Sequence, residues 1–252
     1  MLRQVKLQAV RAKIAAIEAG RSGVQAVLPF GDERIDAALP GGGLPLGRWH
    51  EAVGEGLEAE TGAAMAGFVA ALASPLAQRG AVVWVMRRDD LYAPGLCGLG
   101  FPGQRLIQVL ARDDDEALAA LEDALGTAGV TAAVGEVEEV DLTAGRRLQL
   151  ACERRAATGF VIRRRPSGGA GRIAATGSAA ATRWKIAAAP SQPAAGEPGL
   201  GLPRWRVALE RCRGGRSGEW LMEKNDGAHP LRLVAELGDL QLAPAQPLRL
   251  IA

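Results

Sequence analysis

The stretch from Trp49 to Leu72 constrains the fold more than any other part of the sequence. A strand-like segment, His50–Val53, is followed by several glycines and then by the apolar, helix-forming segment Ala63–Ala73. A phosphate-binding loop has this order, because its glycines let backbone N–H groups surround phosphate oxygens just before a helix begins. The order indicates an α/β protein in which a buried strand leads directly into a helix. The glycines of the predicted loop are Gly54, Gly56 and Gly62.

The residues that bind a nucleotide are missing from this loop. In a working phosphate-binding loop, a Lys after the last glycine reaches the β- and γ-phosphates, and the next Ser or Thr holds magnesium. Ala63 and Ala64 take these two places here, and three carboxylates precede them: Glu55, Glu58 and Glu60. The sequence therefore predicts a degenerate nucleotide site that binds no cofactor. An ordinary strand–loop–helix connection that never bound a phosphate is the alternative.

Composition and cysteine content indicate which kinds of site and environment the sequence supports. The 252 residues, 48% hydrophobic and 23% charged, suffice for one large globular α/β domain. Three cysteines without paired spacing indicate reduced thiols in a cytoplasmic protein, and two histidines leave no His/Cys cluster for zinc. The longest apolar run, Ala63–Ala73, is expected to end at Ser74-Pro75 and is too short for a membrane span. No Ser–His–Asp set or pair of catalytic carboxylates stands out, so we predict a protein that is not an enzyme and has no membrane partner.

The rest of the chain alternates predicted strands with predicted helices. The strands are Ala81–Met86, Arg105–Val109, Val130–Val134, Gly159–Ile162, Thr182–Ala189, Arg204–Cys212 and Glu219–Glu223. The helices are Asp32–Leu39, Asp113–Leu125 and Asp141–Ala157, the last with Leu142, Leu148 and Leu150 facing inward. We therefore expect a mostly parallel central sheet flanked by helices, with antiparallel strands near the C-terminus.

Two segments lie outside the predicted core domain, residues 24–226. Residues 1–19 are predicted to form an amphipathic helix that ends at Gly20 and Gly23. This segment, residues 1–23, either packs on its own domain or is an arm that binds a partner. The C-terminal tail, residues 227–252, carries leucine pairs that suit either a docked edge segment or a linear motif. The apolar stripe of the N-terminal helix consists of Leu7, Val10, Ile14 and Ile17.

A basic stretch without acidic residues extends from Thr158 to Gly196. Its middle, residues 163–181, is rich in glycine and serine and predicts a long loop, which is typically functional or disordered. Such a loop can neutralise phosphates, so we predict weak, salt-sensitive binding of single-stranded DNA, with a solvated loop as the alternative. Trp184 either stacks a base or lies in the core. The predicted DNA contacts are Arg163, Arg164, Arg165, Arg172, Arg183 and Lys185, and the next most plausible basic face is that of the helix with Arg146, Arg147, Arg154 and Arg155.

Residues 28–51 resemble the run that leads into the phosphate-binding loop of RecA-like recombinases. The resemblance rests on Leu28-Pro29-x-Gly31, Asp36-x-Ala38-Leu39, Gly42-Gly43-Leu44-Pro45-x-Gly47-Arg48 and Glu51. It implies a RecA-like P-loop NTPase fold over most of residues 24–223. In that family an acidic residue after the second core strand activates water, and here Arg87 and Arg88 lie in its neighbourhood. Glu136 lies where an active ATPase holds magnesium with an Asp.

The missing Lys, the long basic loop and the chain length resemble the ImuA family, RecA-like proteins of damage-induced mutagenesis cassettes. Such proteins act in SOS translesion DNA synthesis with a Y-family-polymerase-like (ImuB-like) protein and an error-prone replicative polymerase. The resemblance implies a non-catalytic, nucleoid-associated adaptor between that complex and single-stranded DNA, alone or in a RecA filament. The partner would bind the N-terminal helix or, less favoured, the tail from residue 231. A SulA-like cell-division inhibitor and an ATPase with an atypical P-loop are the alternatives.

Overall fold

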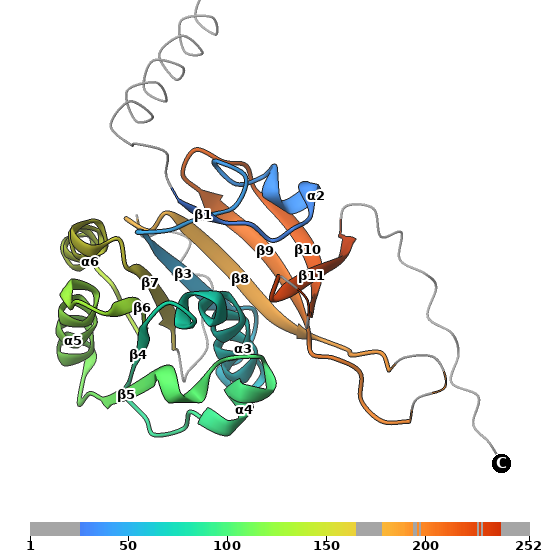
Figure 1. The fold of residues 1–252 in the computed structure, drawn as a ribbon, viewed down its shortest axis with the longest axis horizontal. Coiled ribbons are helices and arrows are strands. Elements are labelled where there is room, and N and C mark those ends of the chain that lie inside the picture. The colour runs from blue at the N-terminus through green and yellow to red at the C-terminus, as the bar shows by residue number, and fades with distance from the viewer. Residues whose placement is uncertain are drawn as a thin grey trace, which may run out of the picture.

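The computed structural model describes residues 26–164, 178–193, 196, 198–225, 227 and 229–237. At its centre lies a sheet with the strand order β11-β10-β9-β8-β3-β7-β6-β4-β5 (Figure 1). The strands from β8 to β5 in this order are all parallel, whereas β9, β10 and β11 each run antiparallel to their neighbours. This confirms the expected α/β class with a mostly parallel sheet, and it is consistent with a RecA-like fold.

The central parallel strands are rich in apolar and β-branched residues, as strands buried on both faces usually are. In chain order the strands of the sheet are β3 (Trp49–Gly54), β4 (Ala81–Met86), β5 (Leu106–Leu110), β6 (Val130–Val137), β7 (Thr158–Arg163), β8 (Thr182–Ala189), β9 (Arg204–Cys212), β10 (Gly218–Lys224) and β11 (Leu231–Glu236). A separate antiparallel pair, β1 (Val27–Leu28) and β2 (Leu44–Pro45), precedes them.

Helices cover both faces of the parallel half of the sheet (Figure 1). One apolar cluster joins the sheet to α3 (Glu58–Ala77), α4 (Ala93–Gly98) and α2 (Glu33–Asp36), and a second joins its other face to α5 (Asp114–Gly126) and α6 (Leu142–Arg155). A 3-10 turn, Gly103–Arg105, precedes β5. Asp113 and Asp141 cap α5 and α6 by accepting hydrogen bonds from the backbone N–H groups of Glu116 and Ala144. These caps explain why both helices begin where the sequence predicts.

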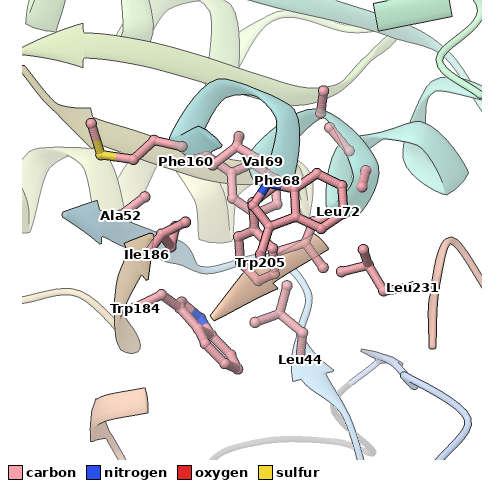
Figure 2. Packing of buried hydrophobic residues seen from close by; sticks show 14 of the residues in the cluster. Leu44, Ala52, Phe68, Val69, Leu72, Phe160, Trp184, Ile186, Trp205 and Leu231 are labelled. Carbon is pink, nitrogen blue, oxygen red and sulfur yellow. The ribbon is translucent and has the colours of Figure 1, made fainter. Parts of the chain in front are cut away.

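Helix α3 is the centre of the larger apolar cluster (Figure 2). Phe68, fully buried on this helix, packs against Trp184 and Trp205 with ring-centroid distances of 5.9 and 6.3 Å. Trp184 is 2% exposed and therefore lies in the core, which is one of the two alternatives that the sequence left open for it; the other, stacking on a base, is excluded by this burial. The helix also continues through Pro75, which the sequence predicted to end it, because this apolar packing outweighs the loss of one backbone hydrogen bond.

The length and apolar composition of α3 meet the requirements for a membrane span, which the shorter predicted run did not. However, 72% of the apolar window is buried inside the protein, as expected for a core helix. Among the described residues no other helix meets the same criteria.

Two predicted details of the elements need correction. In α6 the buried residues are Gly145, Leu148, Ala151 and Cys152, whereas Leu142 and Leu150 are 50% and 59% exposed. The helical period places positions 148, 151 and 152 on one face, and positions 142 and 150 fall outside it. In the tail, Leu231–Glu236 forms β11 and pairs with β10, so this part is a docked edge segment beyond the predicted core boundary at residue 226.

Several predicted elements fall outside the described residues. They are the N-terminal helix with Leu7, Val10, Ile14 and Ile17, the two basic residues Arg165 and Arg172, and the tail from residue 238. The roles assigned to them stay predictions.

Candidate functional site

Only residues 55–57 connect β3 to α3. Gly54 ends the strand, and a Cβ atom there would lie 2.3 Å from the hydroxyl oxygen of Thr61, so the first turn of α3 packs against this position only because it is glycine. Gly56 has a φ angle of 108°, which favours glycine as well. The chain therefore turns through glycines after β3, as predicted.

The remaining residues of the predicted phosphate-binding loop lie inside α3. The helix begins at Glu58, so Gly62, Ala63 and Ala64 belong to its second turn and not to a loop before it. The prediction that these residues form the junction between loop and helix is wrong. Glu58 and Glu60 explain the early start, because carboxylates in the first turn interact favourably with the positive end of the helix dipole.

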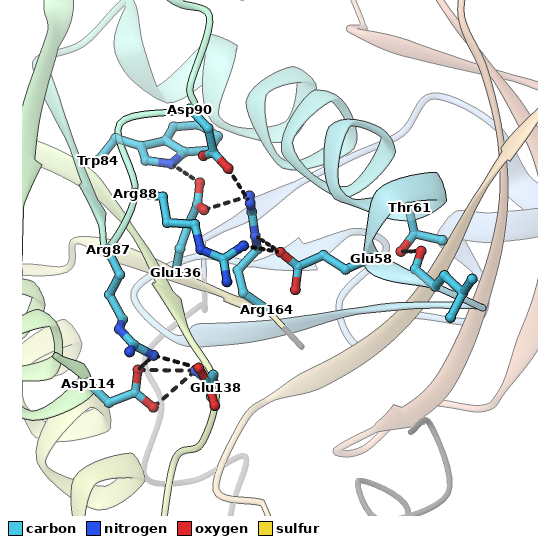
Figure 3. Close-up of polar contacts among 11 residues, drawn as sticks. Glu58, Thr61, Trp84, Arg87, Arg88, Asp90, Asp114, Glu136, Glu138 and Arg164 are labelled. Atoms are coloured by element: carbon cyan, nitrogen blue, oxygen red, sulfur yellow. Dashed lines mark hydrogen bonds and ion pairs between the residues drawn. The ribbon is translucent and has the colours of Figure 1, made fainter. Parts of the chain in front are cut away.

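Arg164 follows β7, and its guanidinium group lies between three carboxylates (Figure 3). Its Nε donates to Glu58 Oε1 at 2.9 Å, its Nη1 to Glu136 Oε2 at 2.9 Å, and its Nη2 to Asp90 Oδ2 at 2.5 Å. The three acids come from the start of α3, from β6 and from the loop after β4. We call these four residues the Arg164 cluster. It lies at the carboxyl ends of the parallel strands, where open α/β sheets bind their ligands.

Glu136 is the most buried acid of the cluster, with its side chain 4% exposed. Its Oε1 accepts a hydrogen bond of 2.7 Å from the indole N–H of Trp84, and its Oε2 accepts from Arg164. Burial raises the pKa of Glu136, against the opposite effects of Trp84 and Arg164. Both oxygens already have protein donors, so this residue is held by the protein at the position where the resemblance implied a magnesium ligand.

The Arg164 cluster lines one part of a pocket of about 640 Å³ between α3 and the segment from Arg88 to Leu99. The rest of the lining is mainly apolar and includes Ala59, Ala63, Ala66, Leu91, Leu96 and Leu99. Tyr92 also lines it and is 73% exposed. Arg88 adds a second guanidinium group, which donates to Glu58 at 3.2 Å. The pocket thus combines an apolar wall with a charged wall in which acids outnumber bases.

Two of the predicted DNA contacts are buried on either side of Glu51 in the sheet. Arg163 Nη1 lies 2.8 Å from Glu51 Oε1, and Arg183 Nε lies 2.8 Å from Oε2. The side chain of Arg163 is 4% exposed, that of Arg183 is 7% exposed, and that of Glu51 is 0% exposed. The strand register explains these contacts. Arg183 on β8 pairs directly with Glu51, and Arg163 on β7 lies two residues after Val161, which pairs with Glu51 from the other side.

The structure corrects the assignment of three of the six predicted DNA contacts. Arg163 and Arg183 are buried and paired with Glu51, and Arg164, 17% exposed, is paired with three carboxylates, so all three neutralise acids of the protein itself. Lys185 is 32% exposed and lies 3.5 Å from Glu55. The signal for this arrangement was present in the sequence: an acid such as Glu51 within a buried strand requires a cationic partner, since an unpaired buried charge is strongly unfavourable.

Exposed basic residues that the sequence analysis did not select lie beside the acid-free loop. Arg211 donates to the carbonyl oxygen of Ser178, where the described chain resumes after the loop, and Arg213 donates to the next carbonyl at 3.4 Å. Burial, together with the positive charges of Arg213 and Arg183, lowers the pKa of Arg211. Positive charge is therefore concentrated at this end of β9. On α6, by contrast, Arg147 is paired with Glu122 at 2.5 Å.

The fold and the site together define the class of this protein: an α/β protein, consistent with a RecA-like fold, in which an arginine at the carboxyl ends of the parallel strands is paired with acids. No protein-family model matches the chain. The chain is 58% identical over 239 residues to Protein ImuA of Caulobacter vibrioides, strain NA1000 / CB15N, covering 91% of this chain and 98% of that protein. Protein ImuA of the same species, strain ATCC 19089 / CIP 103742 / CB 15, matches with the same identity and coverage.

The chain therefore belongs to the ImuA family. This confirms the resemblance drawn from the sequence and, at the level of the family, the association with damage-induced translesion synthesis.

Proposed function

We propose that this protein is a non-catalytic accessory protein of damage-induced translesion DNA synthesis. It acts as an adaptor between single-stranded DNA, alone or in a RecA filament, and an error-prone polymerase complex. That complex contains a Y-family-polymerase-like protein and an error-prone replicative polymerase. Membership of the ImuA family supports the role in translesion synthesis.

The Arg164 cluster is the single observation that supports the non-catalytic part of the proposal. Proteins bind a nucleoside triphosphate at sites where cationic side chains and backbone N–H donors outnumber negatively charged groups. At this edge three carboxylates, Glu58, Asp90 and Glu136, outnumber the guanidinium groups of Arg88 and Arg164. A triphosphate would have to separate Arg164 from Glu58 and Glu136, whose side chains are only 9% and 4% exposed, and a carboxylate left without its partner at such burial is strongly unfavourable.

Equilibrium binding of fluorescent ATP with magnesium tests this part of the proposal. We expect no saturable binding at micromolar ATP to the wild-type protein. Ala63→Lys should not restore binding, because position 63 lies in the second turn of the helix and no hydroxyl at position 64 is present to hold magnesium. Micromolar affinity of the wild type for ATP would contradict the proposal.

The adaptor role is tested in cells that lack the protein. Deletion should reduce DNA-damage-induced mutagenesis without reducing spontaneous mutagenesis, and the full-length chain should restore it. A tagged chain should co-purify with a Y-family-polymerase-like protein after DNA damage. Normal induced mutagenesis in the deletion strain, or a division defect in place of a mutagenesis defect, would contradict the role in translesion synthesis.

A further inference from the structure

We infer that the pocket between α3 and α4 binds an arginine side chain presented by a protein partner. The inference deepens the proposed function, since it rests on the proposal that this site does not bind nucleotide. It concerns the chemistry of the partner segment: an exposed arginine next to apolar residues.

One of the two carboxylate oxygens of Glu58 lacks a hydrogen-bond donor. Its side chain is 9% exposed, and its Oε1 accepts hydrogen bonds from both Arg164 and Arg88. Its Oε2 is buried and has no hydrogen-bond partner. A buried carboxylate oxygen without a donor costs free energy. An additional cationic donor in the pocket would offset this cost, and Arg88, whose side chain is 53% exposed, has room to shift when it enters.

Acids outnumber bases in the lining of the pocket. Glu58, Asp90 and Glu136 all line the pocket, against Arg88 and Arg164. One carboxylate charge therefore lacks a matching cation within the pocket. This excess favours a positively charged occupant and disfavours phosphate, carboxylate or nucleotide.

The apolar wall of the pocket consists of small and aliphatic side chains. Ala59, Ala63 and Ala66 present only methyl groups on α3, and Leu96 and Leu99 lie among the lining residues of the other wall. This lining suits the aliphatic stem of an arginine, whose planar guanidinium can then donate to more than one carboxylate. A lysine would supply a single point charge and fewer donors.

The size of the pocket and the exposed Tyr92 in its lining indicate that the occupant is part of a protein. The pocket volume of about 640 Å³ exceeds that of a single side chain, so it also accommodates the apolar neighbours of the arginine. Tyr92, 73% exposed, offers an aromatic surface to the same segment. Exposed tyrosine beside a pocket that accepts arginine is typical of the energetic centre of a protein–protein interface.

The test uses the full chain, labelled with ¹⁵N, and two small probes followed by NMR. n-Butylguanidinium carries the head group and stem of arginine, and n-butylurea is its neutral counterpart. We expect saturable shifts of the Ala63 and Tyr92 amide signals with n-butylguanidinium and affinity at least about tenfold lower for n-butylurea, as expected for loss of a charge-assisted hydrogen bond. Equal binding of the two probes, or no binding of n-butylguanidinium, would overturn the inference.

Two substitutions and a matched control separate the site from a general effect of charge. Glu58→Gln should weaken n-butylguanidinium binding about tenfold, and Ala63→Leu, at an exposed position, should block the pocket without disturbing the core. Glu60→Gln removes an exposed acid of the same helical turn and should leave binding unchanged. Unchanged binding in Ala63→Leu would place the probe elsewhere and refute the inference. Magnesium ATP is titrated separately, and binding of ATP would refute the proposed function. If neither ATP nor n-butylguanidinium binds, only the arginine pocket is refuted.

Discussion

Replacing Glu51 by Ala tests whether the basic residues beside it support the fold and do not bind DNA. Glu51 is fully buried and accepts hydrogen bonds from Arg163 and Arg183, both at 2.8 Å. Its removal leaves two buried guanidinium groups without their carboxylate. Breaking a buried pair by removing one partner costs about 3–5 kcal/mol. This is a large fraction of the roughly 5–15 kcal/mol by which a domain is stable.

Urea unfolding measures this change directly. The unfolding midpoint of Glu51→Ala should fall strongly at an unchanged slope, because the surface exposed on unfolding is the same. Glu55→Ala is the matched control: Glu55 lies in the loop after the same strand, is 35% exposed and contacts Lys185 and Arg206. Its loss should cost below about 1 kcal/mol.

The result that would refute this reasoning is a Glu51→Ala protein as stable as the Glu55→Ala control. Arg163 and Arg183 would then be satisfied by other groups or by water, and their assignment as DNA contacts would be open again.

Three further predictions concern pH, DNA and the partner. Burial lowers the pKa of His50 to about 4, although its hydrogen bond to the Pro45 carbonyl acts in the opposite direction. The unfolded state therefore binds the proton more readily, and the free energy of unfolding should fall by about 3 kcal/mol as the pH drops from about 6.5 to about 4. Urea unfolding midpoints at pH 7 and pH 5 measure this decline. Arg211→Glu with Arg213→Glu should weaken binding of a labelled single-stranded oligonucleotide and reduce the slope of its salt dependence by about one per lost phosphate contact. Leu7→Glu with Ile14→Glu should leave Tm nearly unchanged while abolishing partner pull-down and damage-induced mutagenesis.

Each of these predictions has a control or an outcome that contradicts it. His50→Gln should remove most of the pH dependence between pH 7 and pH 5, and an equally steep decline in this variant would assign it to other groups. For DNA, Arg146→Glu, an exposed arginine on α6, should have little effect; a larger loss than in the Arg211/Arg213 variant would move the contact to that helix. If the Leu7/Ile14 variant unfolds, the N-terminal helix belongs to the core.

The sequence by itself determined the order and type of most elements. β8 and β9 begin and end at the predicted residues, because alternation within a strand and the turn residues at its ends are local properties. The Asp caps of α5 and α6 are local as well, since the capping side chain and the N–H that it binds lie three residues apart. The family resemblance was likewise carried by one continuous segment, residues 28–51.

The tertiary structure decided which charges are functional and which are structural. Arg163 and Arg183 belong to a basic stretch whose composition predicts an exposed surface. Glu51 lies 112 residues from Arg163 and 132 residues from Arg183 in the sequence, and the sheet places it between them. Arg164 likewise meets Glu58, Asp90 and Glu136 across separations of 106, 74 and 28 residues. The sequence shows which side chains are charged, but the contribution of each charge to stability depends on its burial and on partners from distant strands. The start of α3 at Glu58 shortens the predicted loop to residues 55–57; the acids of the first turn favour this start locally, whereas the close contact between Thr61 and Gly54 exists only in the folded protein.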